Sequence, residues 1–243
     1  DALGQKTGDE FLINAAADNG SQYQPVVADL GDGKFIVTWR DDQGSSHDKS
    51  NDDTAVGSHA DIRGQIFTTF DDNGDALTTP QTSGGDFRVN TDVSGSQYQP
   101  SVTSLNDGGF VFAWRDDSGS SGVDVYGQRF DATGAEQGDE FLINTYTGGS
   151  QYEPSIDAHG DGFVVTWRDD NGAADSRVGS SWDIFAKTFT TMDGATAVDT
   201  PIKGVDEFLV NSGYVGSEQH EPMVASLENG GFVVSWTDRS GAD

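Results

Sequence analysis

Residues 108–130 read GGFVFAWRDDSGSSGVDVYGQRF. The first part is an apolar run that ends at Trp114 and has no polar face, as an interior strand requires. The last part, from Asp124 to Phe130, alternates apolar and polar side chains, which is typical of a half-exposed strand. The segment between them is rich in Asp, Ser and Gly, which favour turns. This stretch therefore predicts two neighbouring β-strands joined by a polar loop.

The same pattern recurs along the chain, which indicates a repeat architecture. The Trp-ending strand occurs at 35–39, 110–114, 163–167 and 232–236, and the alternating strand at 61–67, 124–130 and 183–189. Two further elements recur: an apolar segment ending in Asn at 11–14, 87–90, 141–144 and 208–211, and a Gln-aromatic-x-Pro element at 22–25, 97–100, 151–154 and 219–222. We divide the single domain 1–243 into units of approximately 8–83, 84–137, 138–203 and 204–243, the last without its alternating strand.

The repeats predict an all-β protein, because Gly or Asp interrupts every segment long enough for a helix. About four repeats, each of about four antiparallel strands, predict a β-propeller-like fold with one sheet per blade. A β-trefoil would need three units and an open solenoid shorter ones, so both fit less well. The strand that unit four lacks predicts an unpaired sheet edge, through which the protein would self-associate.

The composition excludes several classes of partner. The 243 residues contain 41 Asp+Glu, of which 33 are Asp, against 13 Lys+Arg, giving a formal net charge of −28. Such a charge repels phosphate backbones and anionic lipid, so we expect no nucleic-acid binding. No apolar run reaches about 18 residues, so we expect no membrane insertion. The absence of Cys excludes disulfides, thiol catalysis and Cys-based zinc sites.

The acidic turn after each Trp strand is the candidate metal site. Paired carboxylates beside backbone and amide oxygens suit a hard cation such as Ca²⁺. The predicted calcium ligands are Asp41, Asp42, Asp116, Asp117, Asp169, Asp170 and Asp238. The alternative interpretation is structural: the Arg of each Arg-Asp-Asp turn pairs with an Asp, while the second Asp caps the turn.

The Gln-aromatic-x-Pro elements are candidate ligand-binding residues. Aromatic rings offer flat faces to sugars, and amides supply hydrogen bonds to hydroxyl groups. The predicted set is Gln22, Tyr23, Gln97, Tyr98, Gln151, Tyr152 and the loop residue Trp182. The alternative is that each Tyr packs between blades while each Gln satisfies buried backbone groups. We expect the Trp residues that end strands to lie in the core.

Catalysis has little support in the sequence. The four His residues share no spacing, and no zinc-binding pair of His residues occurs. Asp pairs can serve as acid and base in glycoside hydrolysis, but carboxylates that recur in every repeat argue against one active site. We therefore predict no catalytic residue and no enzyme, with a polysaccharide-processing enzyme as the least favoured function.

The combined motif resembles a known type of repeat. Gly108 to Trp114, continuing to Tyr126–Ala132, resembles repeats of very large secreted bacterial proteins of the RTX-adhesin or haemolysin-type calcium-binding kind. That resemblance implies secretion to the extracellular space or cell surface, and calcium. The family's Gly-Gly-x-Gly-x-Asp calcium motif is absent, so that site is not carried over. We predict a calcium-dependent adhesion module that recognises a glycan or another cell-surface or matrix ligand, or alternatively a structural or assembly unit of a giant surface protein.

Overall fold

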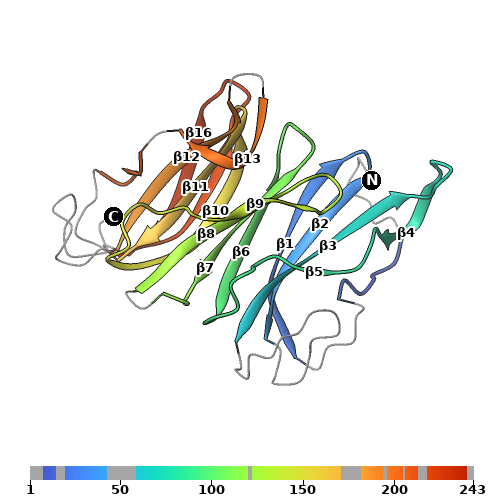
Figure 1. Cartoon of the computed structure of the whole chain (residues 1–243), viewed down its shortest axis with the longest axis horizontal. Helices are drawn as coiled ribbons and strands as arrows, with labels where there is room; N and C mark the ends of the chain where they lie inside the picture. The colour runs from blue at the N-terminus through green and yellow to red at the C-terminus, as the bar shows by residue number, and fades with distance from the viewer. Residues whose placement is uncertain are drawn as a thin grey trace.

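The computed structural model describes residues 8–14, 20–42, 59–119, 122–170, 182–193, 196–204, 206–212 and 218–239. Within these ranges the regular structure consists of strands (Figure 1). Their bounds are β1 Ser21–Gly31, β2 Lys34–Asp42, β3 Ala60–Phe70, β4 Ala76–Thr82, β5 Phe87–Arg88, β6 Gln97–Ser104, β7 Phe110–Asp116, β8 Gly122–Phe130, β9 Glu136–Leu142, β10 Gly149–His159, β11 Gly162–Asp169, β12 Asp183–Asp193, β13 Thr196–Lys203, β14 Phe208–Leu209, β15 Gln219–Ser226 and β16 Phe232–Asp238. No helix in the described ranges has the length and apolar character to cross a membrane.

The strands form four blades, within each of which neighbouring strands pair antiparallel. Blade 1 contains β1–β5, blade 2 β6–β9, blade 3 β10–β14 and blade 4 β15–β16, and a short parallel pairing of β8 with β10 joins blades 2 and 3 into one nine-stranded sheet. In each blade the Gln-aromatic-x-Pro element lies on the first strand and pairs with the Trp strand, which in blades 1–3 pairs in turn with the alternating strand. Figure 1 shows the blades fanned out in chain order, from blue β1 to red β16. The predicted all-β, propeller-like class is confirmed.

The apolar segments that end in Asn complete the preceding blade. β5 pairs with β3, β9 with β8 and β14 with β12. Each of these outer strands stands at the start of a sequence unit but belongs to the sheet of the blade before it. The blades are therefore offset from the sequence units by one strand.

Adjacent blades pack aromatic residues against aliphatic ones. Between blades 1 and 2, Ile36, Ile62 and Ile66 of blade 1 share a cluster with Val102, Phe110, Phe112, Trp114 and Phe130 of blade 2. The Phe110 and Phe130 rings stack with centroids 5.5 Å apart. A second cluster joins blades 2 and 3 around Trp167 and Phe185. Each fully buried side chain of this size contributes roughly 1.5–3 kcal/mol, so these clusters hold neighbouring blades together.

The edge of blade 4 is open in the described part of the chain. There β16 has β15 as its only partner strand. Val233 of β16 is 53% exposed, whereas the equivalent Val111 and Val164 of the covered Trp strands are at 0%. The predicted unpaired edge is thus present in these ranges, and self-association through it stays a prediction.

Candidate functional site

The first strands of all four blades meet at one pocket. β1, β6, β10 and β15 each contain a β-bulge that interrupts their pairing at the Gln-aromatic-x-Pro element, after which the pairing resumes. The residue before each Pro has a left-handed backbone, with φ between 54° and 57°. The pocket has a volume of about 380 Å³ and is lined by Gln24, Pro25, Val26, Gln99, Pro100, Ser101, Glu153, Pro154, Ser155, Glu221, Pro222 and Met223.

The left-handed residues link the blades around this pocket. The Gln24 side-chain oxygen accepts the backbone N–H of Gln99 at 3.0 Å, and Gln99 accepts that of Glu153 at 3.0 Å. Glu153 in turn accepts the N–H of Glu221 at 2.7 Å. A non-Gly residue in the left-handed region costs about 1–2 kcal/mol, and these hydrogen bonds offset part of that cost. The bulge therefore serves to aim one side chain at the next blade.

The pocket is chemically asymmetric although the blades repeat. Blades 1 and 2 contribute the neutral amides Gln24 and Gln99, whereas blades 3 and 4 contribute the carboxylates Glu153 and Glu221. These glutamates are the only ionisable residues among those that line the pocket. Two carboxylates from neighbouring strands thus face one cavity. We did not single out these residues from the sequence, although the change from Gln to Glu within the repeated element was a visible signal.

The predicted ligand-binding tyrosines take part in a stack of alternating rings and guanidinium groups. Arg40 lies 4.3 Å from the centroid of Tyr98, and Arg115 lies 4.8 Å from Tyr98 and 4.6 Å from Tyr152. Tyr98 and Tyr152 are therefore each held between two arginines. Such contacts are worth about 0.5–1 kcal/mol each at exposed sites and more when desolvated. The stack joins neighbouring blades, as the structural interpretation of the tyrosines anticipated.

The stack ends at Tyr23 on one side and at Trp182 on the other. Tyr23 contacts Arg40 at 5.1 Å and is 47% exposed. Trp182 is half-buried, with the Arg168 guanidinium 3.8 Å from its ring. Of the predicted ligand-binding aromatics, Tyr23 thus leaves the largest ring surface open to solvent.

The predicted ligand-binding glutamines lie in a buried polar relay. Gln97 accepts a hydrogen bond from Asn90 at 3.3 Å and donates to Asp116 at 3.3 Å, and both Gln97 and Gln151 are fully buried. The corresponding bonds of Gln22 and Gln151 lead to Asp41 and Asp169. The Asn residues that end the apolar segments are the other members of this relay. These amides satisfy buried carboxylates that belong to two neighbouring blades.

The first Asp of each predicted metal pair is buried opposite another carboxylate. Asp41 faces Asp61, Asp116 faces Asp124 and Asp169 faces Asp183 across neighbouring strands. Burial raises the pKa of Asp124, and the Asp116 charge adds to the rise, whereas the hydrogen bond from Asn144 opposes it. Burial likewise raises the pKa of Asp183 against a hydrogen bond from Asn211.

The second Asp of the pair serves the turn in blades 1 and 2. Asp42 receives two hydrogen bonds from Arg40, at 2.7 and 2.6 Å, and Asp117 receives two from Arg115, at 3.0 and 2.9 Å. Asp170 is half-buried, and this burial raises its pKa.

Asp238, in blade 4, is exposed and accepts a bond from Gln219 at 3.4 Å. Among the described residues no group of three or more His, Asp or Glu side chains gathers as a metal site. Calcium stays a prediction for these turns.

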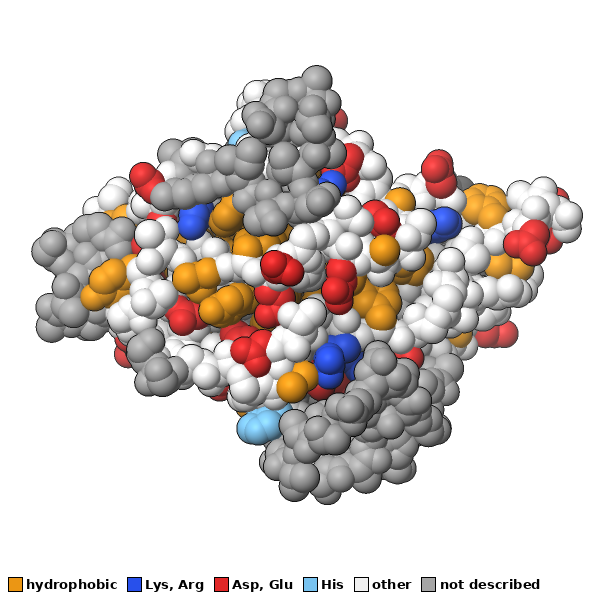
Figure 2. All heavy atoms as spheres, in the orientation of Figure 1, with side chains coloured by type: hydrophobic (Ala, Val, Ile, Leu, Met, Phe, Trp, Pro, Cys, Tyr) orange, Lys and Arg blue, Asp and Glu red, His pale blue; other side chains and the backbone are white. Residues whose placement is uncertain are grey.

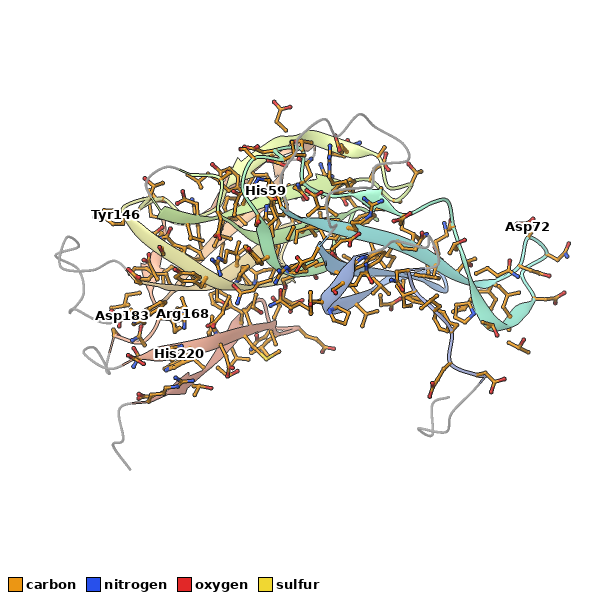
Figure 3. The ribbon with its side chains drawn as sticks, turned by 90° about the horizontal axis from the view of Figure 1, so that it is seen from below. His59, Asp72, Tyr146, Arg168, Asp183 and His220 are labelled. Carbon is orange, nitrogen blue, oxygen red and sulfur yellow. The ribbon has the colours of Figure 1, made fainter. Side chains whose placement is uncertain are left out.

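Most charged side chains of the molecule are acidic, and a basic one stands close to the pocket. Acidic side chains are spread over the face seen in Figure 2, and basic ones are few. Near the pocket the guanidinium of Arg168 lies 3.5 Å from Glu153 and bonds to His220, its neighbour in Figure 3. This arrangement places one cation beside one of the two pocket carboxylates.

Comparison with known sequence families finds no match, and comparison with curated proteins finds none either. Solved structures do resemble the chain. A protein of unknown function from Dyadobacter fermentans aligns with a TM-score of 0.50 at 13% identity, covering 93% of this chain and 64% of that one. An α-L-arabinofuranosidase from Lactobacillus brevis aligns with a TM-score of 0.46 at 12% identity, covering 91% and 66%. The native arabinanase of Bacillus subtilis aligns with a TM-score of 0.46 at 13% identity, covering 89% and 72%.

These likenesses concern the fold. At such low identity, the Dyadobacter fermentans structure supports a propeller-like all-β architecture for this chain and nothing about its chemistry. The chain spans less than two thirds of the length of that protein and of the arabinofuranosidase.

The expected kinship with RTX-type adhesins is corrected by these findings. The solved structures that align with this chain include an arabinofuranosidase and arabinanases, which are enzymes. The predictions of a calcium-dependent adhesion module and of a protein without catalytic activity are corrected with it. The physical reason lies in the motif: Phe110–Trp114 and Phe130 are buried between blades. The motif reflects the packing of a blade, so it does not identify a function.

Proposed function

We propose that this protein hydrolyses glycosidic bonds in the central pocket, with Glu153 and Glu221 as the reacting carboxylates. The observation that carries the proposal is the pair of glutamates facing one pocket where the first two blades have Gln24 and Gln99. Glycoside hydrolysis commonly uses two carboxyl groups on either side of the scissile bond, one as an acid and one as a base or nucleophile.

The carboxylates are not needed for the fold. Gln24 and Gln99 already perform the structural task at this position, because an amide oxygen accepts the next blade's N–H as a carboxylate does. Replacing an amide by a carboxylate there places a negative charge at the pocket. The hydrogen bond to the next blade does not require this charge, because the amide oxygen already makes it. A catalytic role explains why two of the four blades carry Glu.

The surroundings of the two glutamates assign them different roles. Glu153 accepts the N–H of Glu221 and lies 3.5 Å from the Arg168 guanidinium, so a cation stands beside its carboxyl group. The exposed Glu221 accepts a hydrogen bond from the Thr237 hydroxyl at 3.2 Å, and no basic side chain in the described ranges pairs with it. We assign Glu153, which has the cation beside it, as the base or nucleophile, and Glu221, which has none, as the acid that protonates the leaving oxygen.

The rest of the pocket suits a sugar. In the described ranges the side-chain NH₂ groups of Gln24 and Gln99 have no hydrogen-bond partner, so they are available to hydroxyl groups. Pro100, Pro154 and Met223 add apolar surface. Apolar walls with a few oriented polar groups are typical of small-ligand pockets. Arabinan is the first substrate to test, since arabinanases share the fold.

The test is a hydrolysis assay on a panel of arabinan, xylan, mannan and glucan, read as released reducing ends. We expect activity on at least one polymer, and Glu153→Gln and Glu221→Gln to reduce kcat by about 10²–10⁴-fold, as loss of general acid–base catalysis does. Asp75→Asn removes a carboxylate from the exposed β3–β4 hairpin and serves as the matched control. An inactive wild type, or glutamine variants within about twofold of it, would refute the proposal.

Calcium binding and an extracellular location stay predictions beside this proposal. Neither is needed for the chemistry described here, because the acid and the base are both side chains of the pocket. The calcium prediction has its own test among those given in the Discussion.

A further inference from the structure

The arginine that follows each Trp strand has a different partner in blade 3. In blades 1 and 2, Arg40 and Arg115 bind the Asp two residues later through two hydrogen bonds each. Arg168 makes no such pair with Asp170 in the described structure. Its Nη1 instead lies 3.5 Å from Glu153 Oε1 and contacts His220 Nδ1. The same repeat position is thus directed to the pocket in the blade that carries Glu153.

The neighbours of Arg168 hold it in that direction. Its guanidinium lies 3.8 Å from the Trp182 ring and 5.0 Å from the Tyr152 ring, and these two rings also contact each other with centroids 5.4 Å apart. It is largely buried, and burial lowers the pKa of the Arg168 guanidinium while the Glu153 charge opposes that change. Arginine remains a cation in proteins at any pH used for assay. The pocket therefore has a fixed positive charge beside Glu153.

His220 contributes to this arrangement. It stands where the other blades have Tyr23, Tyr98 or Tyr152, and its ring stacks on Trp182 with centroids 6.0 Å apart. Because Arg168 only donates, Nδ1 of His220 is the acceptor of their contact, and Nε2 carries the proton toward Glu218 at 3.3 Å. A tyrosine there would stack but would offer no ring nitrogen to the guanidinium.

We infer that Arg168 is a positioning residue that orients the Glu153 carboxyl group and places a positive charge beside it, so that Glu153 serves as the base or nucleophile of the pair. The inference rests on the proposed function, because it names a residue that supports the same reaction. Glu153 contacts Arg168 on β11, the N–H of Glu221 on β15 and, through its own N–H, Gln99 on β6. His220 on β15 and Tyr152 contact Arg168. Arg168 is the permanent cation in this set.

The kinetic experiment compares Arg168→Met with Arg115→Met. Arg115 also contacts two aromatic rings, those of Tyr98 and Tyr152, but pairs with Asp117, so it is the control for loss of guanidinium–ring contacts. We expect Arg168→Met to lower kcat about 10–100-fold with KM within about threefold, and to move the acidic limb of the pH profile up by about one pH unit. Arg168→Lys retains the positive charge and is expected to return the acidic limb part of the way to its wild-type pH.

Arg115→Met is expected to lower the thermal midpoint about as much as Arg168→Met does, but to leave the acidic limb of the pH profile unmoved. An unmoved limb in Arg168→Met, or an equal movement in Arg115→Met, would overturn the positioning role. Thermal midpoints of all variants establish that each compared protein is folded.

An activity-independent measurement separates this inference from the proposed function. The Glu153 side-chain carboxyl is titrated by ¹³C NMR in the wild type and in Arg168→Met, with Glu153→Gln identifying its resonance. We expect the Glu153 titration to move to higher pH when the guanidinium is removed. A wild type inactive on every polymer refutes the hydrolase proposal alone, and an unmoved Glu153 titration in an active enzyme refutes the positioning role alone.

Discussion

Replacement of Asn144 by Ala tests the buried relay that joins blades 2 and 3. Asn144 is 1% exposed, accepts the backbone N–H of Val125 at 2.7 Å and donates to Asp124 at 2.7 Å and to Gln151 at 3.2 Å. In Asn144→Ala these three buried groups lose their partner, and so does the partly buried Tyr146 carbonyl, which accepts from Asn144 at 2.9 Å. A buried polar group left unsatisfied costs about 1–3 kcal/mol.

The expected loss is about 3–9 kcal/mol, since three buried groups lose a bond at once. Whole domains have unfolding free energies of about 5–15 kcal/mol, so the variant would keep only part of its stability. Urea unfolding followed by Trp fluorescence measures the loss. Far-UV circular dichroism must give the same transition for the two-state treatment to hold.

Two variants control the interpretation. Asn106→Ala removes one exposed bond, to the Gly160 carbonyl at 2.8 Å, and is expected to cost less than about 1 kcal/mol. Asn144→Asp keeps the acceptor for Val125 but adds a carboxylate beside Asp124, so its loss is expected to be large at pH 7 and smaller near pH 4. If Asn144→Ala loses no more than Asn106→Ala, the relay does not stabilise the fold as argued.

The remaining predictions concern charge, stacking and calcium. Burial raises the pKa of Asp183 above 3.8, so the folded state binds this proton more tightly than the unfolded state, and wild-type stability falls as pH rises from about 3.8 through the folded pKa. In urea unfolding, the free energy of unfolding of Asp183→Asn is therefore expected to rise relative to that of the wild type between pH 4 and 7. A difference that stays constant with pH would contradict this. Tyr98→Leu removes two guanidinium contacts and is expected to lower the free energy of unfolding by about 1–2 kcal/mol. Tyr23→Leu removes one such contact and is expected to lower it by about 0.5–1 kcal/mol. Equal losses of the two variants in urea unfolding would count against the stack. Calcium bound at the Arg-Asp-Asp turns predicts a thermal midpoint that rises in millimolar calcium and rises less in Asp42→Asn, and a wild type indifferent to calcium and chelator would exclude it.

Local pattern was sufficient to predict the strands and their repetition. The alternation from Asp124 to Phe130 and the apolar run to Trp114 each report the environment of one strand, and β8 and β7 lie there. The core positions of Trp39, Trp114 and Trp167 followed for the same reason, because a side chain between two packed blades must be apolar. The pairing of a turn Arg with an Asp, seen for Arg40 with Asp42 and for Arg115 with Asp117, was present in the sequence as the structural alternative.

The pocket was decided by the tertiary structure. The bonds from Gln24 to Gln99 and from Glu153 to Glu221 join residues 75 and 68 positions apart. No local periodicity reports such contacts, because they depend on how one blade rotates against the next. The recurring motifs point to the tyrosines and the turn aspartates, whereas the candidate site lies where the repeated element changes from Gln to Glu.

Four similar sheets, their apolar faces and the acidic turns between their strands can be read from the chain alone, because these features depend on side-chain periodicity and turn chemistry. The meeting of four bulges at one pocket, the tyrosines held between arginines and the contact of Arg168 with Glu153 become visible only in the folded molecule. Equivalent residues of a repeat acquire different partners there because neighbouring blades supply different side chains.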